Sequence, residues 1–311
     1  MAFGSDVICI VGPTASGKSK LSIELAERIG GKIVSADSMQ VYRGMDIGTA
    51  KVPPSERKVE HYGLDLVDPG EPYSAALFQE YARECFAKID DDGFRPVICG
   101  GTGFYVRAAI DDYRFPEGEQ VGNSVRDMYN DMLDSKGPVA VWEELESKDP
   151  DSAHAIHPND SKRVIRALEM LDSGESYANQ LKQLHSIQQK VPAMLIGIDV
   201  NRDELNARIE KRVDEMRDQG LVEEVEGLIE RGFREGVTAQ HAIGYKEVAF
   251  ALDGKMSMDE AFESIKTATR RYAKRQRTWF RGDARIRWID GSSGDIEHML
   301  EQTMRVLAAD R

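Results

Sequence analysis

The sequence has few cysteines, no long apolar run and no excess of basic residues. Its three cysteines, Cys9, Cys85 and Cys99, do not form a metal-binding or disulfide pattern, so we expect buried, reduced thiols. No apolar stretch approaches the length of a membrane span, and the first residues lack the basic and apolar regions of a signal peptide. These absences predict a soluble, cytoplasmic protein that does not bind membranes.

The formal net charge of −13 argues against nucleic-acid binding over the whole surface. The segment from Lys266 to Trp288, however, holds nine basic residues and one acid. Its local balance of +8 leaves −21 for the rest of the 311 residues. Such segregation predicts one basic surface that contacts phosphate groups.

A phosphate-binding motif stands near the start of the chain. The residues fit the pattern G-x-x-x-x-G-K-[ST]: Gly12, Pro13, Thr14, Ala15, Ser16, Gly17, Lys18 and Ser19. The apolar run Val7–Val11 predicts a buried strand before the motif, and apolar spacing from Leu21 to Ile29 predicts a helix after it. Backbone N–H groups of such a loop surround an anion, the lysine adds charge, and the Ser19 hydroxyl suits a magnesium ion. The motif therefore predicts a polyphosphate site with Mg²⁺ as cofactor.

Strands and helices alternate after this motif. We expect strands at Lys32–Ala36, at Tyr62–Val67 and at Pro96–Cys99, and a helix from about Ala75 to Ile89. The strand ending at Cys99 runs into a second glycine-rich segment, Gly100–Gly103. In a doubly wound parallel sheet, both glycine-rich segments lie at the carboxyl edge, where such sheets bind ligands.

The middle of the chain has a different pattern, with amphipathic segments and no convincing strand. These segments are Val125–Leu133, Val139–Leu145, Arg163–Leu171 and Tyr177–Ile187. A short apolar strand, Met194–Ile198, follows, and then a helix from Arg202 to Gln219. We predict an α/β fold, a P-loop NTPase-like parallel sheet with flanking helices. Residues 1–111 and 193–311 would form this core, the latter with a basic C-terminal helix, and residues 112–192 would form a helical insertion.

Asp37 directly follows the second predicted strand. An ionised carboxylate there could bind magnesium, accept a proton from a substrate, or cap the next turn. Its place at the carboxyl end of a strand favours a functional role over capping. No acidic residue closes a hydrophobic strand like the magnesium-binding aspartate of an ATPase, and Asp65 and Asp199 come nearest.

Several blocks of sequence occur together in one order and span nearly the whole chain. They are Gly12–Ser19, Asp37–Tyr42 with Gly44–Lys51, Gly100–Tyr105, His157–Asp160 with Lys162–Glu169, Ala242–Glu247 and Lys274–Phe280. The set resembles the tRNA dimethylallyltransferases, also called tRNA isopentenyltransferases. The resemblance implies transfer of a dimethylallyl group from dimethylallyl diphosphate to N6 of the adenosine just 3′ of the anticodon in tRNA. It also implies that the P-loop holds this donor rather than ATP.

Roles for individual residues follow from this resemblance. An adenine amine is a poor nucleophile, so it needs an acceptor for its proton as the C–N bond forms, and we expect Asp37 to be that base. Lys18, the other residues of the phosphate loop and Mg²⁺ at Ser19 would stabilise the departing diphosphate. Thr102 could donate its hydroxyl to the diphosphate or to the base, or simply cap the following helix.

Arg208 and Arg212 lie four residues apart on one face of a predicted helix. The resemblance suggests that this region reaches the diphosphate. Their spacing alone favours a solvated face of salt bridges with Glu204 and Glu215.

An adenine inside a stacked anticodon loop must be extruded before its amine can reach a buried site. With this resemblance, we expect the helical insertion, residues 112–192, and the basic segment to contact tRNA phosphates. The residues expected to bind tRNA are Asp37, Ser38, Met39, Gln40, Thr102, Lys162, Arg163, Val164, Ile165, Arg166, Gly244, Tyr245, Lys246, Arg275 and Arg277. Trp279, Phe280 and Tyr245 could stack on bases or belong to the core. We expect the protein to act as a monomer.

Three other functions fit parts of the sequence. A small-molecule kinase would use ATP on the same loop, and an isopentenyltransferase could act on free adenine nucleotides. A noncatalytic, nucleotide-dependent RNA-binding switch belongs to another class. The basic segment argues against the two small-molecule enzymes, because they need no extended phosphate-contacting surface. Asp37 and the second glycine-rich segment argue against a pure binder.

Overall fold

The computed structural model describes residues 6–115, 124–184 and 187–309. The chain divides into two compact units, Met1–Asp111 with Gln189–Arg311, and Asp112–Gln188. The helical unit thus ends at Gln188 rather than at residue 192. The reason is that the N–H groups of Lys190 and Val191 donate to the carbonyl of Ile110 at 2.8 and 2.9 Å, which joins this segment to the core.

The core is built on a six-stranded sheet with the strand order β3-β2-β4-β1-β5-β6, in which every pair is parallel. The strands are β1 Val7–Val11, β2 Gly31–Ser35, β3 His61–Tyr62, β4 Arg95–Gly100, β5 Ala193–Asp199 and β6 Arg287–Asp290. Because β1 lies between β4 and β5, the loops that follow β1, β2 and β4 meet at one carboxyl edge.

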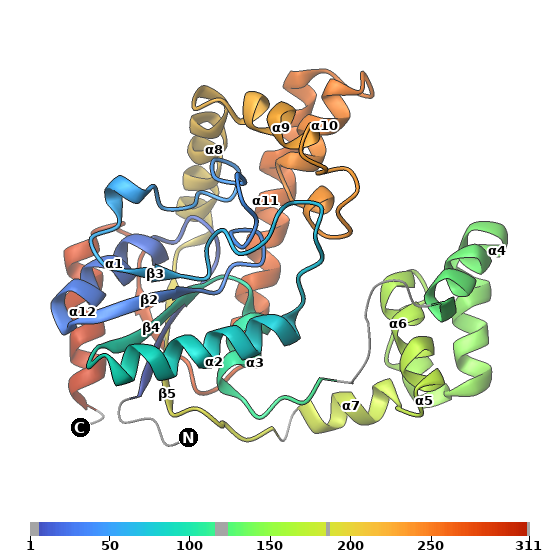
Figure 1. Cartoon of the computed structure of the whole chain (residues 1–311), viewed down its shortest axis with the longest axis horizontal. Coiled ribbons are helices and arrows are strands. Elements are labelled where there is room, and N and C mark those ends of the chain that lie inside the picture. The colour runs from blue at the N-terminus through green and yellow to red at the C-terminus, as the bar shows by residue number, and fades with distance from the viewer. Residues whose placement is uncertain (1–5, 116–123, 185–186, 310–311) are drawn as a thin grey trace. The chain divides into compact units, whose positions relative to one another are not determined.

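Both faces of the sheet are covered by helices. The α-helices of the core are α1 Lys18–Ile29, α2 Ala75–Asp91, α3 Gly103–Ile110, α8 Arg202–Asp218, α9 Leu221–Ile229, α10 Tyr245–Leu252, α11 Met258–Arg281 and α12 Ile296–Ala309. Two short 3₁₀ turns are Pro54–Glu56 and Ala239–His241. In Figure 1, α2 and α3 run along one face of the sheet, and α1 and α12 lie side by side.

The alternation of side chains along a buried strand explains this three-layer arrangement. In β1, Ile8 and Ile10 belong to the hydrophobic cluster that includes α1, α8 and α12. Val7, Cys9 and Val11 belong to the cluster on the other face, with α2 and α3. A strand buried on both faces reads as a continuous apolar run, which is the pattern found in the sequence.

The second unit is helical and has a hydrophobic core of its own. Its helices are α4 Ser124–Lys148, α5 Pro150–His154, α6 Ser161–Asp172 and α7 Tyr177–Leu184. Gly137, with φ of 81°, interrupts α4 just before Pro138, so that the helix consists of two segments. These segments correspond to the two predicted from the amphipathic pattern.

Some predicted elements differ from the observed ones. The strand expected at Tyr62–Val67 is reduced to two residues, because Gly63 and Asp65 adopt positive φ angles of 80° and 56° that end it. The sequence pattern did not predict β6 or α12. The basic segment forms most of α11, which is followed by α12 and is therefore not the last helix. Among the described residues, no helix is both long and apolar enough to cross a bilayer.

Candidate active site

The phosphate loop joins β1 to α1 and has the backbone that its glycines permit. Gly12 and Gly17 have φ angles of 151° and 93°, which residues with a Cβ rarely adopt. A Cβ on Gly12 would also lie 3.1 Å from the carbonyl oxygen of Ile198. The loop therefore packs against β5 while it presents its N–H groups and the start of α1 toward an anion.

Two cations lie at this loop. The Lys18 ammonium donates to the carbonyl of Pro13 at 2.8 Å, and Arg212 from α8 donates to the Thr14 hydroxyl at 3.3 Å. Burial, with the nearby Arg212 charge, lowers the pKa of Lys18 to about 8, against the opposing effects of Cys99 and Asp37. Burial also lowers the pKa of Arg212. A polyanion in this site would favour the charged forms of both groups, so the electrostatics suit a diphosphate.

Asp37 follows β2 and faces the same site. Its Oδ1 accepts a hydrogen bond from the N–H of Met39 at 2.9 Å, which is the turn-capping contact considered as an alternative role. Oδ2 makes no hydrogen bond to any residue that the structure describes. The carboxylate is thus oriented by one oxygen and has the other available to a substrate.

Thr102 follows β4 and contacts the segment that carries Asp37. Its hydroxyl accepts from the N–H of Ser38 at 3.1 Å and lies 3.3 Å from the Ser38 hydroxyl, to which it donates. The hydroxyl makes no capping bond to α3. The structure therefore places Thr102 beside Asp37 and excludes the simple capping role.

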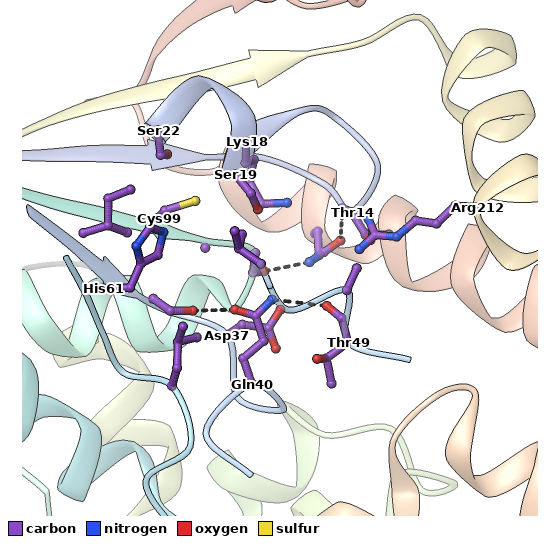
Figure 2. A pocket seen from close by; sticks show the side chains of 18 of the residues that line it. Thr14, Lys18, Ser19, Ser22, Asp37, Gln40, Thr49, His61, Cys99 and Arg212 are labelled. Atoms are coloured by element: carbon purple, nitrogen blue, oxygen red, sulfur yellow. Dashed lines mark hydrogen bonds between the residues drawn. The ribbon is translucent and has the colours of Figure 1, made fainter. Parts of the chain in front are cut away.

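Two pockets meet at these residues. One has a volume of about 80 Å³ and is lined by Lys18, Ser19, Gln40 and Cys99 among others. Figure 2 shows Asp37, Gln40 and Thr49 facing Lys18 and Ser19 across this pocket, with Arg212 next to Thr14. The other pocket has a volume of about 280 Å³, and its walls include the apolar side chains of α8 and α11. Both pockets are lined by Thr14, Asp37, Thr49, Arg212 and Tyr272.

The remaining residues predicted to bind the donor have different positions. Ser19 lines the first pocket. Arg208 donates to the carbonyl of Ser292 and lies, with Ala15–Lys20, along an outer groove of about 790 Å³. Arg212 lines the groove and both pockets and donates to Thr14, so it reaches the candidate donor site, while Glu215 on the same helix also lines the groove.

The structure corrects part of the predicted RNA-binding segment in the helical unit. Lys162 and Arg163 are exposed on α6, and Arg166 is half-buried 3.7 Å from Glu169. Val164 and Ile165 are buried in the hydrophobic core of that unit, so the prediction that they contact RNA is wrong. Helical periodicity explains the difference, since consecutive residues of a helix point to different sides.

The segment before α10 lies at the second pocket. Gly244 and Tyr245 line it together with Ser38 and Met39. Tyr245 is fully buried, and its hydroxyl donates to Glu224 at 2.6 Å, so it belongs to the core as well as to the pocket wall. Lys246 is partly exposed, 3.3 Å from Glu247.

The basic helix α11 has less free charge than its sequence suggests. At least five of the nine basic residues of the segment form ion pairs: Lys266, Arg270, Arg277, Arg281 and Arg285. In particular, Arg277 lies 3.2 Å from Asp199 and its side chain is partly buried, which gives it a structural partner besides any contact with RNA. Arg271, Lys274 and Arg275 are exposed along one helical face, with no carboxylate of the described chain paired to them.

Sequence reasoning missed three residues that shape the site. Gln276 and Tyr272 on α11 line the first pocket. Glu224 on α9 accepts hydrogen bonds from the N–H groups of Ile47 and Gly48 at 2.8 and 3.3 Å, next to Thr49. The signal for Gln276 was a polar residue on the apolar face of a helix, between Ala273 and Phe280. For Glu224 the partner lies 176 residues away, and no local pattern marks it.

Comparisons with known proteins agree with this geometry. Two family models match the sequence, IPP transferase over residues 40–283 and isopentenyl transferase over residues 5–62. The tRNA dimethylallyltransferase of Geobacillus thermodenitrificans is 46% identical over 285 residues, which cover 91% of this chain and 90% of the relative. That of Rhodococcus jostii is 44% identical over 306 residues, which cover 98% and 96%.

Two solved structures have the same architecture. The tRNA isopentenylpyrophosphate transferase of Bacillus halodurans superimposes with a TM-score of 0.71 and 40% identity, covering 98% of this chain and 96% of that one. A eukaryotic dimethylallyltransferase acting on tRNA gives a TM-score of 0.78 with 28% identity, covering 98% and 79%. The fold and site thus define an isopentenyl transferase with a P-loop NTPase-like core, as predicted. The chain belongs to the tRNA dimethylallyltransferase family.

Proposed function

We propose that the protein transfers the dimethylallyl group of dimethylallyl diphosphate to N6 of the adenosine just 3′ of the anticodon in tRNA. The observation that carries the proposal is that a cationic phosphate-loop pocket and a larger, partly apolar pocket meet at one carboxylate, Asp37. The first pocket would hold the diphosphate. The extruded adenosine would approach through the second, which is lined by Arg275 and by the segment before α10.

In this reaction, N6 forms a bond to C1 of the dimethylallyl group while the bond from C1 to the diphosphate oxygen breaks. The proton leaves N6 for Asp37, whose Oδ1 is held by the Met39 N–H while Oδ2 accepts. Lys18 and Arg212 stabilise the negative charge that develops on the diphosphate. The hydroxyl of Thr102, next to Ser38, would donate to the base or to the leaving group.

The residues at the loop fit a magnesium ion that arrives with the diphosphate. Among the described residues, no group of three or more histidines, cysteines or acidic residues could hold a metal ion alone. Mg²⁺ needs no such cluster, because it keeps several waters and binds through substrate phosphates and one or two protein oxygens. The Ser19 hydroxyl is the protein oxygen at this position. When bound, Mg²⁺ would neutralise charge on the diphosphate.

We further propose that the enzyme acts as a monomer in the cytoplasm. Lys18, Asp37 and Arg212 line the first pocket together, so the groups that the proposed reaction needs are already assembled within the chain. Light scattering at the concentration of the activity assay would test the monomer, and a dimer whose dissociation abolishes transfer would contradict it.

The test of the main proposal is incubation of the protein with radiolabelled dimethylallyl diphosphate, Mg²⁺ and bulk unmodified tRNA. We expect label in tRNA, no label in free AMP, and no tRNA product when ATP replaces the donor. Label in AMP alone would indicate an isopentenyltransferase for free nucleotides. ATP-dependent phosphorylation of a small metabolite, with no label in tRNA, would indicate a kinase.

A further inference from the structure

The two glycine-rich loops of the site are joined by one buried side chain, Gln276 of α11. Its Oε1 accepts a hydrogen bond from the N–H of Thr14 at 2.8 Å. Its Nε2 donates to the carbonyl of Gly101 at 2.9 Å. The side chain is 5% exposed, so water cannot easily replace either bond. One amide thus links the phosphate loop after β1 to the loop after β4.

The surroundings of Gln276 are built for this contact. A Cβ on Gly101 would lie 2.2 Å from Nε2, so only glycine leaves room for the amide at this position. A side-chain amide accepts at its oxygen and donates at its nitrogen, as the two backbone partners require. Loss of the side chain would leave the buried carbonyl of Gly101 and the part-buried N–H of Thr14 without these partners.

The two backbone partners of Gln276 lie next to residues with a proposed role in the reaction. Thr14 is held on its other side by Arg212, which donates to the Thr14 hydroxyl. Gly101 immediately precedes Thr102, whose hydroxyl contacts Ser38 beside Asp37. The N–H of Thr14 is used by Gln276, so the anion-binding N–H groups of the loop begin at Ala15. A shift of either loop would change the distance between the diphosphate and Thr102.

We propose that Gln276 is a positioning residue that fixes the phosphate loop relative to the Thr102 loop. The role rests on the proposed transfer reaction, and Gln276 acts in it through the backbone groups of Thr14 and Gly101. Misplacement of reacting groups by about 1 Å can reduce a rate by roughly 100-fold. Loss of Gln276 should therefore reduce turnover and donor binding more than tRNA binding.

The test compares Gln276→Met, which has nearly the same shape but no amide, with the wild type. We expect kcat for dimethylallyl transfer to fall by about 10- to 100-fold, while the KM for tRNA changes by less than about twofold. Binding of inorganic pyrophosphate, measured by calorimetry, should weaken several-fold, because that binding needs the loop geometry and no transfer. Gln276→Asn is one methylene shorter and cannot reach both partners, so it should share these defects.

Gln302 on α12 provides a matched control. Its Oε1 accepts from the N–H of Asp290 and its Nε2 donates to the carbonyl of Asp290, both at 3.0 Å and away from the pockets. Gln302→Met should leave kcat and pyrophosphate binding unchanged. The proposal is overturned if Gln276→Met and Gln276→Asn have wild-type kcat and pyrophosphate affinity, or if their defects equal those of Gln302→Met. It is also overturned if Gln276→Met and Gln276→Asn both fail to fold. If the wild-type protein has no transferase activity, the proposed function is refuted. The calorimetric measurement of pyrophosphate binding would then still decide whether Gln276 positions the phosphate loop.

Discussion

The phosphate-loop core and the helical unit use their predicted functional residues in different ways. In the core, residues far apart in sequence form hydrogen bonds with each other, such as Arg212 with Thr14 and Thr102 with Ser38. In the helical unit, the predicted RNA-binding residues are consecutive positions of α6, and the helix turns some of them outward and others inward. A contiguous sequence motif is therefore enough to locate the phosphate site. The residues that a helix exposes to RNA, in contrast, must be chosen by their helical spacing.

The largest effect is expected at the base of the reaction. Asp37→Asn should keep the fold and tRNA binding, because the amide is nearly isosteric, but it cannot accept the proton from N6. General-base catalysis contributes about 10²- to 10⁴-fold, so the single-turnover rate with bound tRNA and donor should fall by that amount. A wild-type rate would assign Asp37 to its turn alone. A loss restored by excess magnesium would make it a metal contact.

Donor binding should depend on pH through Lys18. Burial lowers the pKa of this lysine to about 8, and a bound diphosphate raises it by favouring the charged form. Below pH 8 the Lys18 ammonium is charged, so binding of the diphosphate is strongest. Above pH 8 the neutral lysine must take up a proton when the diphosphate binds. The affinity for the diphosphate therefore falls by up to about tenfold per pH unit. Calorimetric titration with inorganic pyrophosphate measures the dependence. Lys18→Met should have a flatter profile, and equal profiles would exclude Lys18 as the cause.

The two arginines of the basic helix should separate into one RNA contact and one structural residue. Arg275 is exposed and lines the second pocket, whereas Arg277 is ion-paired with Asp199. Arg275→Ala should weaken tRNA binding several-fold and reduce its salt dependence, because fewer counterions are released. Arg277→Ala should lower the melting temperature and leave the salt dependence unchanged. If both variants reduce the salt slope equally, the structural assignment of Arg277 is wrong.

Within α6, neighbouring residues should have opposite effects. Val164→Ala removes buried methyl groups and should destabilise the protein by about 2 kcal/mol, with little effect on the intrinsic affinity of folded protein for tRNA. Lys162→Ala should leave stability unchanged and weaken tRNA binding modestly, because about one contact with an RNA phosphate is lost. Denaturant unfolding and filter binding distinguish the two. If Lys162→Ala lost stability and Val164→Ala lost affinity for tRNA, a different side of α6 would face the RNA.

The sequence was sufficient to predict the parallel sheet, the phosphate loop and the position of Asp37, because buried strands and glycine-rich turns have strong local patterns. Local pattern could not predict the short edge strand β6, with its three exposed residues, or the partners of Glu224 and Gln276. It also overstated the free charge of α11, since the carboxylates of Asp214 and Asp199, which pair with Lys266 and Arg277, lie on other elements. Long-range pairs of this kind become visible only when the chain is folded.

The central claim is that the core transfers a dimethylallyl group to one adenosine next to the anticodon. The most direct test uses a synthetic anticodon stem-loop with adenosine at that position and a matched one with guanosine there, each incubated with dimethylallyl diphosphate and Mg²⁺. Nucleoside mass spectrometry should detect N6-dimethylallyladenosine from the first RNA and no prenylated nucleoside from the second. Equal modification of both RNAs, or of neither while free AMP is prenylated, would contradict the account.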